Sequence, residues 1–153
     1  MDNVKELIRN KPRIFILISV IYLVALALGK WRIHPSGDTA WFLAGGVIGI
    51  YFLDGAELFF HLTPSPFRSV VFMALFTIVG LFVVTSSGST LASGLVLSLY
   101  LQMILWHVGE LRVTGNLTSW YRMMAVPVAL KTQQIILFLF SVLFLLETYF
   151  FIQ

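Results

Sequence analysis

Two apolar stretches of this chain carry acidic and imidazole side chains at helical spacing. One stretch contains Asp54, Glu57 and His61, and a later one contains His107 and Glu110. At about 100° per residue, the first three side chains fall within about 60° of one another on a helix, and residues three apart also share a face. Ionisable groups inside an apolar helix are rare and mark functional sites. The two stretches therefore predict one cation or proton site.

Two kinds of chemistry fit these residues. Glu57 with His61, and His107 with Glu110, have spacings that allow two side chains of one helix to bind one metal ion, as in helical bundles with carboxylate–histidine sites. Because the chain has no cysteine, such a ligand set favours Zn, Mn or Fe. The second interpretation is a proton or cation relay, in which Asp54 is an additional ligand or proton carrier.

A structural role for the same residues is the alternative. Asp54 or Glu57 then pairs with His107 or with an interfacial arginine, while His61 and Glu110 reach headgroup water. No residue is assigned a catalytic role. We expect two further side chains, Gln102 and Trp106, to flank the pocket.

Composition predicts that membrane helices position these groups. Hydrophobic residues make up 59% and charged residues 11% of 153 residues, whereas globular domains are about 25% charged. A chain this small cannot hide so much apolar surface in a soluble core. A soluble enzyme, a disordered chain and a disulfide scaffold are therefore excluded in favour of a polytopic membrane protein.

We expect five transmembrane helices in a single domain, 1–153, because lipid offers no partner for free backbone groups. The basic residues within 1–13, the apolar run after them and Ala25-Leu26-Ala27 near the end of the first span resemble a secretory signal with its cleavage site. We expect this span to be retained, and four spans remain if it is cleaved. The predicted all-α bundle has its spans at about 14–29, 41–61, 67–85, 91–111 and 134–152.

The distribution of basic residues predicts an orientation. With five spans, eight of the ten Lys and Arg residues fall on one side and only Lys30 and Arg32 on the other. This places the amino terminus in the cytoplasm and the carboxyl terminus outside a cytoplasmic-type membrane. The polar groups of the second and fourth spans then share one level of the inner leaflet, roughly 5–15 Å from the span midpoints.

We expect those two spans to pack together, and the second span to lie at the centre of the bundle because it also carries a groove of small residues on nearly the opposite side from its polar stripe. Gly45 and Gly49 form a GxxxG pair, which lets another helix approach closely. Other polar and aromatic residues are expected to be structural: Glu147 is predicted to pair with Lys30 or Arg32, and Trp120 with its neighbour is predicted to be an interfacial anchor.

The leading functional hypothesis is a membrane protein that binds or conducts a cation, either a proton or a divalent metal ion. A metal-dependent membrane enzyme at the cytoplasmic interface is one alternative, and a non-catalytic subunit or assembly factor is another. The expected partners are membrane lipid and a second copy or another membrane protein. Nucleic acid is not expected, because the basic residues do not cluster on one face.

Overall fold

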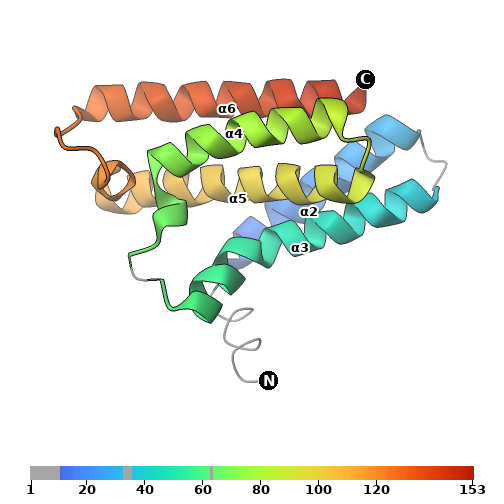
Figure 1. Cartoon of the computed structure of the whole chain (residues 1–153), viewed down its shortest axis with the longest axis horizontal. Helices are drawn as coiled ribbons and strands as arrows, with labels where there is room; N and C mark the ends of the chain where they lie inside the picture. Colours follow the sequence, from blue (N-terminus) through green and yellow to red (C-terminus); the bar gives the residue numbers. More distant parts are fainter. Residues whose placement is uncertain (1–10, 33–35, 63) are drawn as a thin grey trace.

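The protein is all-helical in the parts that the computed structural model describes, which are residues 11–32, 36–62 and 64–153. Two short 3₁₀ helices, η1 (Pro66–Arg68) and η2 (Thr118–Tyr121), lie in the connections before α4 and before α6. The predicted all-α fold is confirmed. Five long helices make up the bundle: α2 (Arg13–Trp31), α3 (Gly37–Phe60), α4 (Val70–Ser86), α5 (Thr90–Thr114) and α6 (Leu130–Ile152) (Figure 1).

Four of these helices, α2, α3, α5 and α6, are long and apolar enough to cross a membrane. Helix α4 is apolar too, but its 17 residues extend only about 26 Å, compared with about 30 Å for a bilayer core. The apolar helices suggest a multi-pass membrane protein. The count of five membrane spans stays a prediction.

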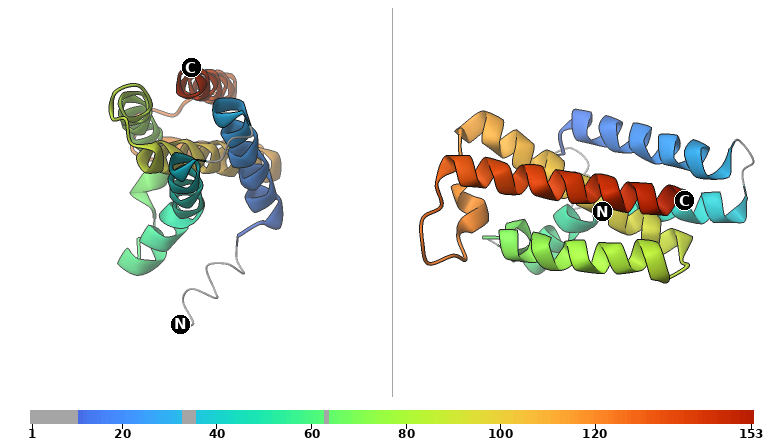
Figure 2. Two further views of the ribbon diagram at one scale, coloured as in Figure 1. Left: turned by 90° about the vertical axis from the view of Figure 1, so that its right-hand side faces the viewer. Right: turned by 90° about the horizontal axis from the view of Figure 1, so that it is seen from above.

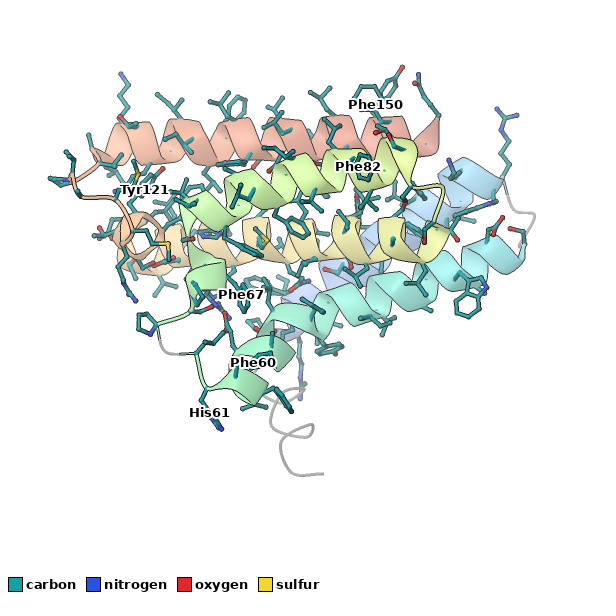
Figure 3. The ribbon with its side chains drawn as sticks, viewed as in Figure 1. Phe60, His61, Phe67, Phe82, Tyr121 and Phe150 are labelled. Atoms are coloured by element: carbon teal, nitrogen blue, oxygen red, sulfur yellow. The ribbon has the colours of Figure 1, made fainter. Side chains whose placement is uncertain are left out.

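Helix α5 lies at the centre of the bundle, with the other long helices around it (Figure 2). Most residues in the apolar stretch of α5 are buried, whereas most of those in the apolar stretches of α2 and α6 are not. Phe138 and Leu145 of α6 are exposed, as is Phe150 of the same helix, which Figure 3 labels. An outer surface of large apolar side chains is typical of helices that face lipid.

Helices α3 and α5 cross in backbone contact. A Cβ atom added to Gly45 or Gly49 would collide with the carbonyl oxygens of Leu91 and Leu95 in α5. The hydroxyl of Ser98 donates a 2.8 Å hydrogen bond to the Gly46 carbonyl at the same crossing. The predicted packing of the second and fourth expected spans against each other is confirmed. The helices meet through the glycine face of α3, however, and not through the polar face that was expected to join them. The predicted central position of the second span is wrong, because α5 is the more buried helix.

Away from this crossing the two helices separate. Figure 1 shows the carboxyl-terminal half of α3 turning away from α5, with the start of α2 and η1 on the same side of the bundle. The close contact at one end of the helix pair thus leaves space at the other, because two straight rods that cross at an angle must diverge. The candidate site occupies this space.

Candidate functional site

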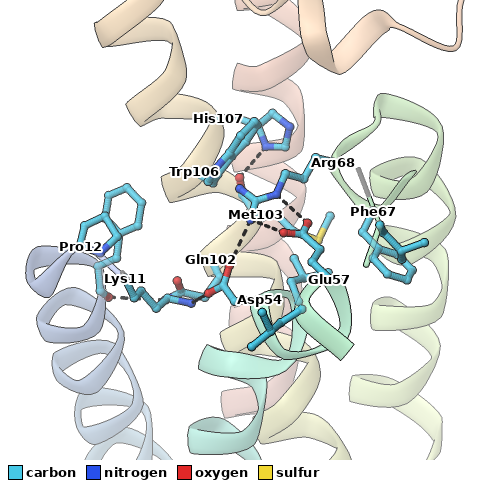
Figure 4. A pocket seen from close by; sticks show the side chains of 14 residues that line it. Lys11, Pro12, Asp54, Glu57, Phe67, Arg68, Gln102, Met103, Trp106 and His107 are labelled. Carbon is cyan, nitrogen blue, oxygen red and sulfur yellow. Dashed lines mark hydrogen bonds and ion pairs between the residues drawn. The ribbon is translucent and has the colours of Figure 1, made fainter. Parts of the chain in front are cut away.

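A pocket of about 520 Å³ lies between the carboxyl-terminal halves of α3 and α5. Its volume falls in the range of about 300–1,000 Å³ that is usual for ligand pockets. Apolar side chains make up most of the wall. The polar and charged side chains that line it are Lys11, Asp54, Glu57, Arg68, Gln102 and His107 (Figure 4).

Arg68 is held in this pocket by the two carboxylates of α3. Its Nε and Nη2 atoms each lie 2.7 Å from a different oxygen of Glu57, which makes a bidentate pair. Nη2 also donates to Asp54 Oδ1 at 3.1 Å, and the guanidinium lies 4.4 Å from the centre of the Trp106 ring. A planar guanidinium suits both contacts, since it matches a carboxylate edge and stacks on an aromatic face.

Lys11 is the second cation of the pocket, and its side chain is only 6% exposed. The ammonium nitrogen lies 2.7 Å from Asp54 Oδ2 and also donates to the backbone carbonyl of Ile50. The same nitrogen lies 5.5 Å from the centre of the Tyr51 ring. All three contacts come from one turn of α3.

The two cations differ in how far the neighbouring carboxylates offset the effect of burial on their pKa values. Burial lowers the pKa of Lys11, and the hydrogen bond and charge of Asp54 offset that effect only in part. Burial also acts to lower the pKa of Arg68, but the hydrogen bonds and charges of Glu57 and Asp54 outweigh it, so the pKa is raised. Arg68 is therefore the firmly held cation and Lys11 the weakly held one.

His107 lines the pocket and is 1% exposed. Its Nδ1 atom lies 2.5 Å from the Met103 carbonyl oxygen. Since a carbonyl only accepts, Nδ1 carries the hydrogen of this bond. Nε2 is buried, and no hydrogen-bond partner for it exists among the described residues.

Trp120 packs against the His107 ring, with 4.5 Å between the ring centres. Its side chain is fully buried, and that of Tyr121 nearly so. The prediction that these two residues are interfacial anchors is therefore wrong. The short helix η2 turns Trp120 inward, where its ring packs against His107 of α5 and Phe140 of α6, and Tyr121 packs against Trp120.

The structure brings three of the five predicted site residues, Asp54, Glu57 and His107, to one pocket. His61 does not join them, because α3 ends at Phe60 and His61 adopts a left-handed conformation with φ of 51°. The helical repeat that was expected to place His61 beside Glu57 therefore stops before His61. His61 is exposed, and Figure 3 shows it at the far end of the helix.

Glu110 also lies apart from the pocket. Its Oε1 atom accepts a hydrogen bond from the hydroxyl of Ser119 in η2. Within the described ranges, no three or more His, Asp or Glu side chains are arranged to hold a metal ion. The four side chains expected as metal ligands, Glu57, His61, His107 and Glu110, thus do not form one site.

The two residues expected to flank the pocket both line it. Trp106 supports the Arg68 guanidinium. Gln102 is buried and donates through Nε2 to Ser19 Oγ at 2.5 Å, which ties α5 to α2. Gln102 therefore has a packing role in addition to its place in the wall.

Sequence reasoning did not identify Lys11 and Arg68 as site residues, since both were counted only as charges outside the spans. Arg68 is an arginine of the kind that the structural alternative names as a partner for Asp54 or Glu57. Its signal was its position just after Pro64 and Pro66, in the short connection that follows α3. No pattern in the sequence distinguished Lys11 from the other basic residues near it.

Glu147 of α6 is a separate buried carboxyl group, 1% exposed. Neither of its oxygens has a hydrogen-bond partner within the described part of the chain, and the predicted pair with Lys30 or Arg32 is wrong. Lys30 donates instead to the Phe151 carbonyl and lies over the ring of that residue. The Glu147 side chain fits where Gly80 of α4 leaves room.

The chain has no significant match among protein-family models, curated proteins or solved structures.

Proposed function

We propose that this chain is a multi-pass membrane protein that binds a small monovalent cation in the pocket between α3 and α5, with Asp54 as the carboxylate that receives it. One observation carries the proposal. Asp54 and Glu57, one turn apart on α3, already hold two cationic side chains in a pocket of ligand size.

Charge supports a monovalent ligand. With Lys11 and Arg68 in place, the two carboxylates are neutralised. If Lys11 leaves, Arg68 still pairs with Glu57, and one negative charge remains on Asp54 in a partly buried pocket. An uncompensated charge in such a place is unfavourable, so the pocket attracts one positive charge.

The distribution of basic residues supports a pocket on the cytoplasmic side. Under the predicted orientation, the amino terminus and the α3–α4 connection lie in the cytoplasm of a cytoplasmic-type membrane, and the carboxyl terminus lies outside. A cation then enters from the cytoplasmic surface. For transport across the membrane, a chain of this size would act as an oligomer.

A non-catalytic membrane subunit is the second candidate function. The favouring observation is that the ion-pair network joins the segment before α2, helix α3 and η1, as a structural clamp does. A metal-dependent enzyme has less support, since the described His, Asp and Glu side chains do not gather into a three-ligand group.

Cation titration of the purified protein separates these functions. The wild type and Lys11→Ala are titrated in detergent with sodium, potassium, guanidinium and propylammonium chlorides at constant ionic strength, and Tm is measured. We expect a saturable rise in Tm with at least one cation, and its loss in Asp54→Asn. Asp38→Asn is the matched control, because Asp38 lies on the same helix but is exposed.

Lys11 competes from within the same chain, at an effective concentration of about millimolar order. The wild type is therefore expected to need more cation than Lys11→Ala. If no cation gives a saturable shift in either protein, cation binding is overturned and the structural clamp is the remaining function.

A further inference from the structure

We infer that the place filled by the Lys11 ammonium is a binding site for primary ammonium groups, and that Lys11 is a tethered occupant which an amine-bearing ligand displaces. The inference rests on the proposed cation binding and names its ligand class. It is carried by the combination of Asp54 Oδ2, the Ile50 carbonyl and the Tyr51 ring around one nitrogen.

The three groups match the chemistry of a primary ammonium. Such a group has three N–H donors, and here a carboxylate oxygen and a backbone oxygen accept from it. The aromatic face of Tyr51 attracts the charge. A quaternary ammonium has no N–H to donate, and hard metal ions require more oxygen ligands than this place offers. The arrangement therefore selects for an amine.

The cradle does not depend on Lys11 for its shape. Ile50, Tyr51 and Asp54 all belong to α3, within five consecutive residues of a regular helix. The second oxygen of Asp54 is held by Arg68, which Glu57 and Trp106 fix in turn. The acceptors therefore keep their places when the Lys11 side chain withdraws.

Lys11 is suited to exchange. It lies ahead of α2, which begins at Arg13, and it pairs with a single carboxylate oxygen, whereas Arg68 is bidentate and stacked. The carboxylates compensate Lys11 for burial only in part. An incoming amine therefore replaces the more weakly held of the two cations.

The rest of the pocket accommodates the organic part of an amine. Phe15, Leu58 and Phe67 contribute apolar wall beside the charged groups. An alkyl chain gains from contact with such side chains. The shared chemistry is R–NH₃⁺, which is present both in soluble amines and in the ethanolamine headgroup of membrane lipids.

Chemical rescue tests this site. Lys11→Ala deletes the part of the side chain that corresponds to propylammonium and leaves Asp54 without that partner, so its Tm is expected to fall below that of the wild type. Propylammonium chloride should restore the Tm saturably. Tetramethylammonium chloride should bind about tenfold more weakly or worse, because it cannot donate to the two oxygens.

The controls are matched within the chain. Lys11→Ala/Asp54→Asn should show no rescue, because the carboxylate is gone. Lys131→Ala removes an exposed lysine and should neither lower the Tm nor respond to propylammonium. If Lys11→Ala does not fold, Lys11→Met keeps the aliphatic chain and is tested in the same way.

Nanodiscs distinguish the two sources of the amine. Lys11→Ala is reconstituted in phosphatidylcholine alone or with phosphatidylethanolamine. A Tm restored by phosphatidylethanolamine without added amine identifies a lipid headgroup, whereas restoration by propylammonium only, in both membranes, identifies a soluble amine.

Two results would overturn the inference while leaving cation binding at Asp54 intact: equal rescue by tetramethylammonium, or binding of sodium or guanidinium without propylammonium. Rescue that survives Asp54→Asn would overturn both the inference and the role of Asp54 in the proposed function. Absence of every cation effect, in both the wild type and the variants, overturns the proposed function as well.

Discussion

Gly49 of α3 and Leu95 of α5 meet where the two helices cross, and the Leu95 carbonyl oxygen occupies the space that a side chain on Gly49 would need. The contact involves backbone atoms, which cannot rotate away as the end of a flexible side chain can. Together with the similar approach of Gly45 to the Leu91 carbonyl, this contact sets how closely the helices meet, and the pocket opens as they separate beyond the crossing.

Gly49→Ala is therefore expected to push α3 from α5. Overpacking of this kind lowers the free energy of unfolding by about 1–3 kcal/mol, measured as the change in Tm and denaturant midpoint in detergent. Gly55→Ala is the matched control on the same helix, since nothing lies within 4 Å of its added Cβ. It should be neutral or raise stability by up to about 1 kcal/mol. Equal stability of the two variants would contradict the assignment of the crossing.

Arg68→Met is expected to destabilise the protein by leaving Glu57 without its bidentate partner. The pair is partly buried, so we expect a loss of about 1–3 kcal/mol, between the values for exposed and buried pairs. Arg68→Met/Glu57→Gln should recover part of that loss, because no unpaired charge then remains. A double-mutant cycle measures the coupling.

The control for this cycle is Arg112→Met, which removes an exposed arginine and should change the Tm little. Strictly additive effects of the Arg68 and Glu57 substitutions would show that the observed contact contributes no coupling.

Tyr121→Phe should make the protein more tolerant of alkaline pH. Burial raises the pKa of the Tyr121 phenol above its usual value of 10.0. As pH rises past 10, the unfolded chain loses this proton before the folded protein does, so the free energy of unfolding falls. The variant lacks this contribution, and its Tm should decline less steeply above pH 10.

At neutral pH the same substitution should leave the Tm unchanged or raise it, because the buried Tyr121 hydroxyl has no hydrogen-bond partner among the described residues and its removal ends that cost. Parallel declines of Tm for the wild type and Tyr121→Phe above pH 10 would be inconsistent with a raised pKa.

Glu147→Met is expected to stabilise the protein. The carboxyl group is buried without a hydrogen-bond partner in the described structure, and methionine has a similar length with no polar group to desolvate. A gain of about 1–3 kcal/mol corresponds to the cost of an unsatisfied buried group, read as a rise in Tm.

Glu57→Met serves as the comparison for Glu147→Met, since the Glu57 carboxylate is paired with Arg68 and its loss should lower the Tm. A fall in Tm for Glu147→Met as well would mean that the Glu147 carboxyl makes a favourable interaction.

The helices themselves were predictable because the signals that define them are local. Long apolar runs must pair their backbone groups within the segment, and the glycines of α3 allow a close neighbour wherever that neighbour comes from. The placement of Asp54 and Glu57 on one face of α3 follows from the helical repeat in the same way.

The partners of those carboxylates were not predictable from spacing. Lys11 and Arg68 lie 43 and 14 residues from Asp54, and their positions depend on how α2 and η1 are placed against α3. His61 left the predicted cluster because one left-handed residue ended the helix. Trp120 lies inside the bundle, and not at its surface as predicted, because η2 directs its ring onto His107 of α5.

The amino-acid sequence by itself thus determined an apolar all-helical chain, the acidic face of α3 and the small residues that let another helix approach α3, since each follows from repeats within a segment. Only the tertiary structure decided that this face meets Lys11 and Arg68 and that His61 and Glu110 lie elsewhere. Contacts between distant segments depend on the path of the connections and on helix crossing geometry, and neither is written in the spacing of residues along one helix.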